Sequence, residues 1–368
     1  MVVGTLAVAA GALAAASYGV AVARGAPLAP WTSALLPHPV ITIPNGPRVG
    51  YNLRYAPLVS FPGPADSNSP AFWENGQLIV FNSQEALWRS SGMDVTGLTD
   101  AEPITCETCS DAGGHWLEAI WHDDTTGVLY GWYHFEPLLF APLLIPCLTA
   151  PLIGAAVSLD GGLTWEDRGT VLTNAYENAC DDQNGFFSGG NGDFSVIVDP
   201  DGRFFYFVFT NYGGPVAQQG IGIARSSFAE RGQPGTAVKY YEGAWNEPGL
   251  GGRVTPLFST PTGWAGPYVD AFWGPSIHWN TFVHAYVVLL NRTVGPDMDW
   301  AQEGVYLTMS RDLAAWSTPV KLLAGDHWYP QVIGMGEDGT DTYAGQQARL
   351  FVGGVSQFIL EFDAPEGS

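Results

Sequence analysis

The feature that most constrains the fold is a pattern of strands that recurs five times along the chain. In each copy a polar turn leads into an apolar strand, a turn containing Gly or Asp follows, and an aromatic-rich strand and a Ser-containing strand complete the unit. The copies begin at Ser69, Leu117, Asp193, Gly274 and Tyr329. A small antiparallel sheet of this kind cannot bury both of its faces alone, so successive copies must pack against each other.

Turn and strand composition supports this interpretation. ENG, PDG and TTG are hairpin turn sequences, and the flanking segments are rich in Val, Ile, Phe, Tyr and Trp, which strands favour. The 46 Gly and 27 Pro make long helices unfavourable. Radial packing of the copies predicts an all-β, five-bladed β-propeller, in which the first strand of each blade lines a central channel. Residues 49–61 are expected to close the ring, and a large β-sandwich with irregular spacing is the alternative.

The chain starts with an apolar run rich in Ala, Gly and Val. Ala21-Val22-Ala23 is a small-x-small sequence that a signal peptidase could cut, although the usual positive charges before the run are missing. The run is also about as long as the shortest membrane-spanning helix, so a retained anchor is the alternative. We predict an extracytoplasmic or secreted protein with a signal peptide or anchor over residues 1–23, a linker over 24–48 and the propeller over 49–368.

The net charge of −22 restricts the partners of the protein. With 36 acidic and 14 basic residues, nucleic acid and anionic membrane surfaces are unfavourable partners. Neutral carbohydrate stays compatible, because aromatic faces and hydrogen bonds bind it without cations. The scarcity of Lys and Arg also argues against a phosphorylase, which would need a phosphate-binding group.

The chain contains four cysteines, Cys106, Cys109, Cys147 and Cys180. Disulfides are expected in an exported protein, and four cysteines allow three pairings. We favour a Cys147–Cys180 bridge between two long loops, with Cys106–Cys109 as a tight local bridge. No nearby Cys or His pair completes a zinc site around the local pair, so no metal site is predicted.

Two strand ends carry motifs. Residues 158–165, SLDGGLTW, resemble the Asp-box of sialidases and other propellers, S-x-D-x-G-x-T-W. In such a hairpin the Asp caps backbone N–H groups, a Gly takes a left-handed conformation and the Trp packs beneath the turn, so we expect Asp160 to be structural. Residues 310–316, SRDLAAW, resemble the S-x-D-L-x-x-W strand end of five-bladed glycoside hydrolases of families 43, 32 and 130.

Together with the five entry strands, these motifs make residues 66–362 similar to those glycoside hydrolases. The resemblance implies that carboxyl groups at the starts of the innermost strands break a glycosidic bond. One carboxyl protonates the leaving oxygen, a second activates water or attacks, and a third often raises the pKa of the acid. A sialidase is disfavoured, because those enzymes clamp a carboxylate sugar with arginines and no F-R-I-P sequence precedes a strand here.

Three acids stand at the starts of the first three repeats. Asp66 occupies the place of the base in the family 43 pattern, Glu118 that of the pKa-tuning Asp, and Asp193 that of the acid, usually Glu. At the last two positions the residue types are exchanged relative to the pattern, with the longer Glu where the family has Asp and the shorter Asp where it usually has Glu. Either Glu118 or Asp193 could therefore be the acid. Each of the three could instead cap turn amides. Glu118 lies on an apolar strand, where a carboxylate is costly without a function, and a Gly-rich segment before Asp193 permits close approach of backbone or ligand.

Other polar and aromatic residues lie near the same strand starts. His134 and Glu136 point to one side of a strand and could bind substrate or form a buried structural pair. Asp270 opens the fourth repeat and is a further candidate. Candidate substrate-binding residues whose rings could contact sugar or pack in the core are His115, Trp116, Trp273 and Trp328. No cofactor is expected beyond a structural calcium ion, for which Asp181 and Asp182 are candidates.

These observations predict a monomeric, exported glycoside hydrolase that acts on a neutral polysaccharide, such as one containing arabinofuranose. The resemblance to family 43 implies inversion by an acid–base pair, with Asp66 as base and Glu118 or Asp193 as acid, while the residues alone leave inversion and retention open. The alternative is a non-catalytic propeller that binds glycans or another surface partner. Carboxyl spacings of roughly 5 to 10 Å around an open pocket favour hydrolysis. Scattered acids, each tied to backbone amides, favour binding alone.

Overall fold

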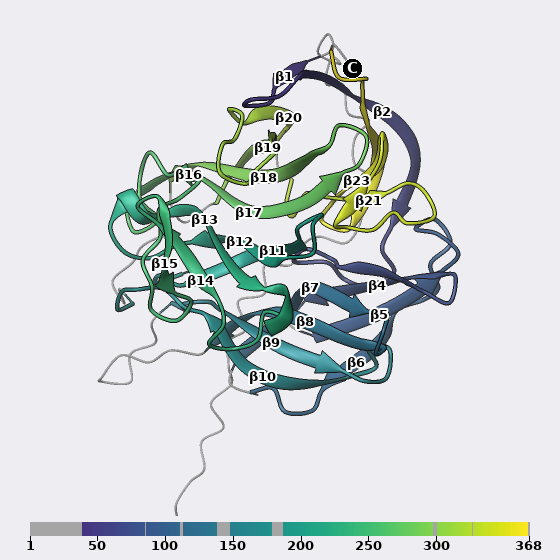
Figure 1. Ribbon diagram of the computed structural model, residues 1–368, viewed down its shortest axis with the longest axis horizontal. Helices are drawn as coiled ribbons and strands as arrows, with labels where there is room; N and C mark the ends of the chain where they lie inside the picture. Colours follow the sequence, from purple (N-terminus) through teal and green to yellow (C-terminus); the bar gives the residue numbers. More distant parts are fainter. Residues whose placement is uncertain are drawn as a thin grey trace, which may run out of the picture. The chain divides into compact units, whose positions relative to one another are not determined.

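In the computed structural model, pairing between β-strands organises the described part of the chain, whose helical residues form two short 3-10 turns, η1 (Val216–Gln218) and η2 (Phe228–Glu230). The structure describes residues 39–84, 86–110, 113–137, 148–178, 187–296, 300–325 and 327–366. These residues belong to the unit Leu35–Ser368. Their strands form four sheets, one of which joins two antiparallel groups through a single parallel strand pair, and the five strand groups are here named blades one to five (Figure 1). This pairing confirms the predicted all-β propeller and does not fit the β-sandwich alternative.

The first four blades follow one another along the chain. Blade one contains β3 (Ala71–Glu74), β4 (Gln77–Gln84), β5 (Ala86–Gly92) and β6 (Glu102–Cys106). Blade two contains β7 (Gly113–Asp123), β8 (Val128–Pro137), β9 (Leu152–Ser158) and β10 (Thr164–Leu172). Blade three contains β11 (Asn191–Val198), β12 (Phe204–Asn211), β13 (Gly220–Ser227), β14 (Val238–Tyr241), β15 (Ala244–Pro248) and β16 (Phe258–Ser259). Blade four contains β17 (Tyr268–Asn280), β18 (Ala285–Pro296), β19 (Gln302–Ser310), β20 (Val320–Ala324) and the parallel β22 (Tyr343–Ala344).

Blade five combines strands from both ends of the described chain. It contains β21 (Gln331–Gly334), β23 (Gln347–Val352), β24 (Val355–Phe362), β2 (Arg48–Ser60) and β1 (Val40–Thr42). β2 pairs with β24 from Tyr51 opposite Phe362 to Ser60 opposite Val355, which confirms the ring-closing strand predicted for residues 49–61. β1 pairs with β2, so part of the segment predicted as a linker is a strand of this blade.

Apolar clusters fill the spaces between neighbouring blades, which explains why no single repeat is sufficient for a core. The cluster between blades one and two contains Phe81 and Trp165, and the cluster between blades two and three contains Trp132 and Phe207. Ile197 and Ile277 lie in the cluster between blades three and four, and Phe61 and Phe351 in the cluster between the start of blade one and blade five. Because each cluster draws on two blades, the blades stabilise one another around the ring.

The two turns that carry motifs are built alike. Asp160 Oδ1 accepts two backbone N–H groups at 3.0 and 3.1 Å, and Asp312 Oδ1 accepts two at 2.9 Å. Trp165 and Trp316 each donate their indole N–H to the carbonyl three residues earlier. Both carboxylates therefore act within their own turns, as predicted for Asp160.

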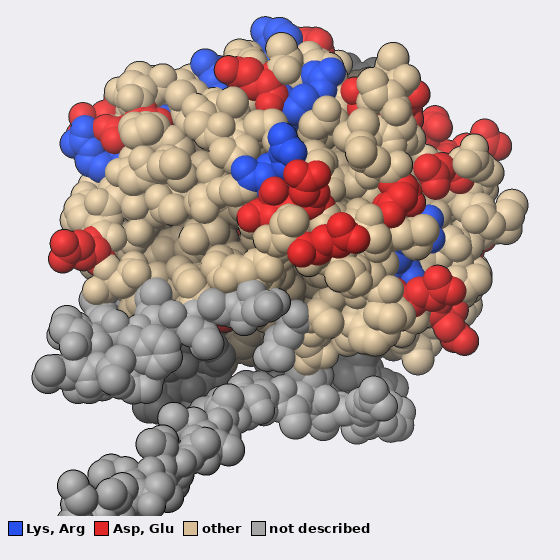
Figure 2. All heavy atoms as spheres, turned by 90° about the horizontal axis from the view of Figure 1, so that it is seen from below, with Lys and Arg blue, Asp and Glu red and all other residues tan. Residues whose placement is uncertain are grey.

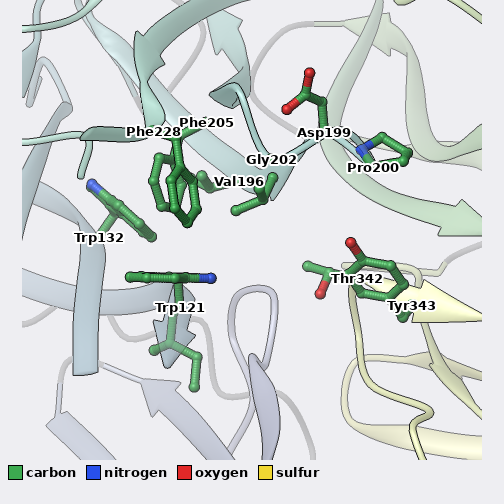
Figure 3. A pocket seen from close by; sticks show the side chains of 12 residues that line it. Trp121, Trp132, Val196, Asp199, Pro200, Gly202, Phe205, Phe228, Thr342 and Tyr343 are labelled. Carbon is green, nitrogen blue, oxygen red and sulfur yellow. The ribbon is translucent and has the colours of Figure 1, made fainter. Parts of the chain in front are cut away.

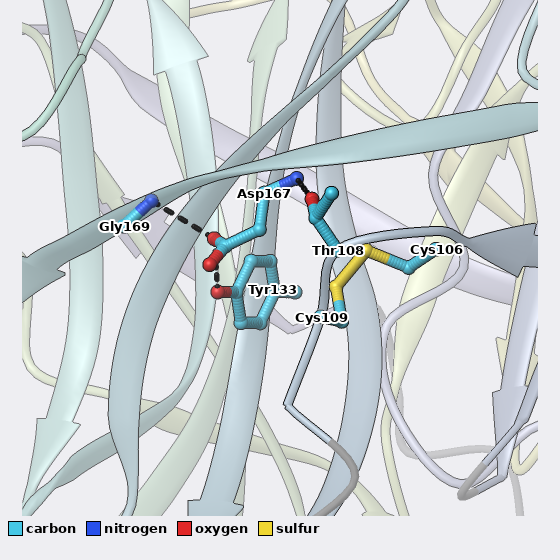
Figure 4. Close-up of a disulfide and its surroundings, with 6 residues drawn as sticks. All are labelled: Cys106, Thr108, Cys109, Tyr133, Asp167 and Gly169. Carbon is cyan, nitrogen blue, oxygen red and sulfur yellow. Dashed lines mark hydrogen bonds between the residues drawn. A yellow bond between two sulfur atoms is a disulfide. The ribbon is translucent and has the colours of Figure 1, made fainter.

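A disulfide joins Cys106 and Cys109, with their Cα atoms 5.4 Å apart, and confirms this predicted pair. It lies where blades one and two meet, because β6 pairs in parallel with β10. Between the two cysteines, the Thr108 hydroxyl accepts the backbone N–H of Asp167 at 2.7 Å, and Asp167 accepts the Tyr133 hydroxyl at 2.6 Å (Figure 4). The disulfide thus constrains a loop that connects the two blades.

Candidate functional site

Three inner strands are interrupted by a β-bulge. The extra residue is Glu118 in β7 and Asp193 in β11, and a third shift follows Trp273 in β17. Leu117 and Ala119, on either side of Glu118, pack into different clusters between blades, so the bulge directs Glu118 elsewhere, toward β11. Bulges commonly re-aim side chains next to active sites, and here they do so for two of the three predicted acids.

Glu118 is 2% exposed and has few hydrogen-bond donors around it. Its Oε2 accepts the backbone N–H of Phe194 at 2.6 Å, and its Oε1 lies 3.6 Å from His134 Nδ1. Burial raises the pKa of Glu118 well above its ordinary value; the charge of His134 opposes this rise and that of Asp193 adds to it. Glu118 therefore keeps its proton at a pH at which an ordinary carboxyl group has lost it.

Asp193 is held in an unusual backbone conformation. Its φ of 36° is left-handed, which is costly for a residue other than Gly and is characteristic of functional sites. Its Oδ2 accepts the Tyr212 hydroxyl, and the Tyr329 side chain also hydrogen-bonds to the carboxyl group. Burial raises the pKa of Asp193, while the charge of His134 and these two phenols act against that rise. The bulge and the phenols fix this carboxyl in one orientation.

His134 on β8 connects the two acids with Glu136. Its Nδ1 accepts the backbone N–H of Asp193 at 2.9 Å, and its Nε2 faces Glu136 Oε1 at 3.2 Å. Burial by itself lowers the pKa of His134, but the hydrogen bond to Glu136 and the surrounding carboxylates raise it to about 9. In the neutral ring Nδ1 accepts the Asp193 N–H, so the proton that charges the ring must be added to Nδ1. That protonation breaks the hydrogen bond from the Asp193 N–H. His134 and Glu136 thus belong to the same cluster as the acids.

Asp66 reaches the same region from blade one. It is half-buried, and its backbone N–H donates to the carbonyl of Ser83 at 2.8 Å. Desolvation raises the pKa of Tyr329 well above its ordinary value, and the charges of Asp193, Asp66 and Glu118 raise it further. Ser83 Oγ in turn accepts the backbone N–H of Leu117, the residue before Glu118, at 3.0 Å, so the segment that carries Asp66 lies beside the bulge of β7.

Asn68 ties the inner segments together near the bulges. Its Nδ2 donates to the carbonyls of Phe194 at 2.8 Å and Pro275 at 3.0 Å. The backbone of Ser69 exchanges two hydrogen bonds with the amide of Gln331, at 2.5 and 2.8 Å. These contacts connect the start of blade one with blades three, four and five, and they fix the backbone whose N–H group serves Glu118.

An aromatic cluster lies beside the acids. Its members are Phe187, Tyr212, Trp264, Trp273, Trp300, Trp328 and Tyr329. Trp273, a predicted sugar contact, is fully buried and donates its indole N–H to Gln302 at 3.1 Å, so it packs in the core. Trp328 is half-buried, with its ring centroid 5.3 Å from that of Trp273, and stays a candidate for contact with sugar.

His115 and Trp116 precede Glu118 on β7. Trp116 packs edge to face against His134 with ring centroids 5.5 Å apart, and its buried indole N–H has no hydrogen-bond partner among the described residues. His115 is half-buried and stacks on Phe135 with ring centroids 4.4 Å apart. Trp116 therefore borders the acid cluster, whereas His115 packs on Tyr133 and Phe135, and a contact of either residue with substrate stays a prediction.

Asp270 lies apart from the cluster. Arg292 binds both oxygens of its carboxylate, each at 3.0 Å. Val269 and Ala271 pack into the aromatic cluster, so Asp270, between them on β17, points to the other side of the strand. The structure thus brings Asp270 into an ion pair on the surface of blade four and not into the site.

The buried cluster also has the composition of a metal site. Glu118, His134 and Asp193 each offer a ligand atom, and these atoms lie within 4.8 Å of one another. In the present arrangement, however, His134 Nδ1 and Glu118 Oε2 accept backbone N–H groups, which an ion would have to displace. The absence of a metal cofactor stays a prediction. The remaining candidates, Asp181, Asp182, Cys147 and Cys180, lie outside the described residues.

No protein-family model and no curated protein matches the sequence. Among solved structures, the chain is similar to a putative exo-β-1,3-galactanase from Bifidobacterium bifidum, with 12% identity, a TM-score of 0.49, and coverage of 84% of this chain and 92% of that chain. It is also similar to an endo-arabinase from Bacteroides thetaiotaomicron (10% identity, TM-score 0.49, coverage 86% and 99%). A third similar structure is an exo-1,5-α-L-arabinanase from a bovine ruminal metagenomic library, with 11% identity, a TM-score of 0.46, and coverage of 81% of this chain and 94% of that chain. These are glycoside hydrolases, the class that the sequence motifs resemble; at such identities the likeness concerns strand arrangement and assigns no role to a residue.

The partners of the acids are the part of the site that the sequence did not indicate. Tyr212 follows the apolar strand β12, Tyr329 opens the fifth repeat and Asn68 lies in a polar turn, and nothing in these positions indicates contact with Asp193 or Phe194. The one local signal was the Gly-rich segment before Asp193, which fits a bulge with a left-handed residue.

Proposed function

We propose that this protein hydrolyses glycosidic bonds in a neutral polysaccharide, with arabinofuranose-containing polymers as the first candidates. The observation that carries the proposal is that two bulges bring Glu118 and Asp193 together around His134, with the segment of Asp66 beside them. Acid–base hydrolysis of a glycosidic bond needs carboxyl groups in different environments, one that keeps its proton and one that is ionised.

The spacing of the acids supports a division of roles. Ligand atoms of Glu118 and Asp193 lie within 4.8 Å of each other, whereas the two carboxyl groups of an inverting enzyme lie about 6.5–9.5 Å apart to admit a water molecule. For inversion, the partner of Glu118 must therefore be Asp66. We assign Glu118 as the proton donor, Asp193 as the charge that sustains its high pKa, and the half-buried Asp66 as the base.

The surface favours a neutral substrate. The net charge of −22 repels polyanions. On the face shown in Figure 2, most of the described surface is uncharged, and Lys and Arg lie next to Asp and Glu without forming one basic patch. His115, Trp116 and Trp328 supply aromatic and polar groups near the acids, which suits recognition of sugar rings.

We further propose that the protein is an exported monomer. The Cys106–Cys109 disulfide is compatible with an oxidising compartment. Within the described ranges, no helix has both the length and the apolar character that a membrane span requires. The signal peptide or anchor predicted for residues 1–23 lies outside these ranges.

One observation favours a second candidate, a propeller that binds glycans without cleaving them. Glu118 and Asp193 are 2% and 4% exposed, and each already accepts hydrogen bonds from the protein. In this arrangement, the partly exposed Asp66 and Glu136 mark the side from which substrate would approach. A binding protein of this kind would keep its affinity after the loss of either inner acid.

The proposal is tested with the full-length protein on a panel of arabinan, arabinoxylan, galactan and glucan, by measuring the release of reducing ends. Glu118→Gln should lower kcat by roughly 10²- to 10⁴-fold, the usual contribution of a general acid. Gln can still accept the Phe194 N–H group, so the melting temperature should change little. Asp312→Asn, which alters an acid of a turn, is the control for activity.

Turnover equal to that of the wild type in Glu118→Gln would remove Glu118 from the mechanism. Release of no reducing ends by the wild type, with a polysaccharide bound equally well by both proteins, would instead support the non-catalytic alternative.

A further inference from the structure

A cavity of ≈ 250 Å³ lies further along the same inner strands (Figure 3). Trp121 on β7 comes three residues after Glu118, and Val198 on β11 five residues after Asp193, and both line the cavity. At about 3.3 Å per residue, the lining residues of these two strands lie roughly 7–17 Å along the chain from the acids. The cavity is therefore separate from the candidate active site, and none of the residues discussed for hydrolysis lines it.

The cavity combines apolar walls with free hydrogen-bonding groups. Ile120 and Val196 contribute apolar surface, and the nitrogen edge of the Trp121 ring turns toward Thr342 and Tyr343 (Figure 3). Within the described part of the chain, Tyr343 hydrogen-bonds through its backbone N–H, which donates to Thr340 Oγ1 at 3.1 Å, and neither its hydroxyl nor the Trp121 indole N–H has a hydrogen-bond partner. Tyr343 is 36% exposed, so its hydroxyl can be reached from solvent.

The charged groups around the cavity are already paired with one another or with aromatic rings of the protein. The Arg231 guanidinium lies over the Trp121 ring at 4.9 Å and the Phe228 ring at 4.4 Å. Asp199 accepts two backbone N–H groups, at 2.5 and 3.0 Å, and pairs with Arg203 Nε at 3.3 Å. A cationic ligand would have to compete with these arginines, and an anionic ligand would meet the Asp199 carboxylate. A neutral ligand meets neither obstacle.

We propose that this cavity binds one neutral sugar unit. A sugar ring presents a C–H face, which suits Trp121, Ile120 and Val196, and hydroxyls, which suit the indole N–H, Tyr343 and Thr342. The volume is below the about 300–1,000 Å³ of sites for drug-sized ligands, which limits the occupant to a single small ring. The inference holds whether or not the acids hydrolyse a glycosidic bond, because it uses none of them.

The test is saturation-transfer NMR on the full-length protein, with L-arabinose, D-xylose and D-galactose as separate probes. Trp121→Ala should weaken binding of the preferred sugar by at least about 10-fold, and Tyr343→Phe by about 3- to 10-fold, the usual effect of one lost hydrogen bond. The matched control is Trp245→Ala: Trp245 is also half-buried and also lies beneath an arginine, Arg225 at 4.5 Å, but it does not line the cavity. It should bind the sugar like the wild type.

Glu118→Gln separates this inference from the proposed hydrolysis, because it should lose turnover and keep sugar binding at the cavity. The inference is overturned if none of the three sugars binds, if Glu118→Gln abolishes the signal, or if Tyr343→Phe and Trp121→Ala bind as the wild type does. If Trp121→Ala fails to fold, Tyr343→Phe decides, since it removes only one oxygen. Preferential binding of tetramethylammonium would overturn the assignment to a neutral ligand.

Discussion

The carboxyl groups of the motif-bearing turns and those of the inner strands are chemically alike but have opposite surroundings. Asp160, in an exposed turn, accepts hydrogen bonds from the Ser158 and Thr164 hydroxyls and from two backbone N–H groups. Partial burial raises the pKa of Asp160, but these hydrogen bonds outweigh it and lower the pKa to about 2. Glu118, on an inner strand, accepts one backbone N–H and is closely approached by Asp193, and its pKa is raised.

The difference shows that the number of donors and the access of water decide what a carboxyl group does in this fold. An acid surrounded by N–H and O–H donors is stabilised as an ion and strengthens its turn. An acid buried beside another acid favours its neutral form and costs the fold stability. Such a pair does not stabilise the core, and a role in chemistry is the proposal that the following predictions test.

The largest effect is expected for Asp193→Asn, if the inner acids act together. Asn can still accept the Tyr212 hydroxyl, but it removes a charge that raises the pKa of Glu118 and of His134. Both pKa values should fall, so the alkaline limb of the pH profile of kcat/KM should move to lower pH, with activity reduced by about 10²-fold or more. An unchanged alkaline limb would show that Asp193 does not tune the acid, and Asp312→Asn should leave the profile as it is.

The contrast between the two kinds of acid also shows how far the sequence could lead. The blades and the Asp160 turn were predictable, because each depends on residues close together in the chain. The approach of Glu118 and Asp193 was predictable only as a consequence of strand starts meeting at the axis of a propeller, and the role of Asp66 beside them stays a prediction. Predicting that approach required no knowledge of register.

What could not be predicted depends on register and on contacts between repeats. The bulge at Glu118 breaks the alternation of strand faces, so a period of two cannot show where this side chain points. Asp270 opens an inner strand as the other acids do, but no bulge re-aims it and Arg292 binds it. Position at a strand start is therefore not enough, and among the acids on inner strands the bulge distinguishes Glu118 and Asp193 from Asp270.

An intermediate effect is expected for Asp160→Ala. The variant loses the hydrogen bonds of one exposed turn, so the free energy of unfolding should fall by about 1–2 kcal/mol, with turnover unchanged because the turn is remote from the acids. Urea denaturation measures the loss. Asp338→Ala, at an exposed turn acid without a hydrogen bond in the described structure, is the control and should change stability by less than about 0.5 kcal/mol. An equal loss in both variants would mean that the capping bonds do not stabilise the turn.

The smallest expected effect is a change with pH in the free energy of unfolding of each variant relative to the wild type. It separates the two kinds of acid most directly, because the change has opposite signs for Asp160→Asn and Glu118→Gln. The pKa of Asp160 is about 2 in the folded protein, below its ordinary value of 3.8, so its stabilisation is present above about pH 4 and is lost as the pH falls through 2. The stability advantage of the wild type over Asp160→Asn should therefore shrink on acidification. The pKa of Glu118 is raised in the folded protein, so the folded state binds the extra proton and its stability falls as the pH rises above about 4.5. Glu118→Gln lacks this penalty, and its stability relative to the wild type should increase with pH. Urea denaturation of the wild type and both variants from pH 3 to pH 8 measures the two slopes, and slopes of the same sign would show that the inner and turn acids do not differ in the way described.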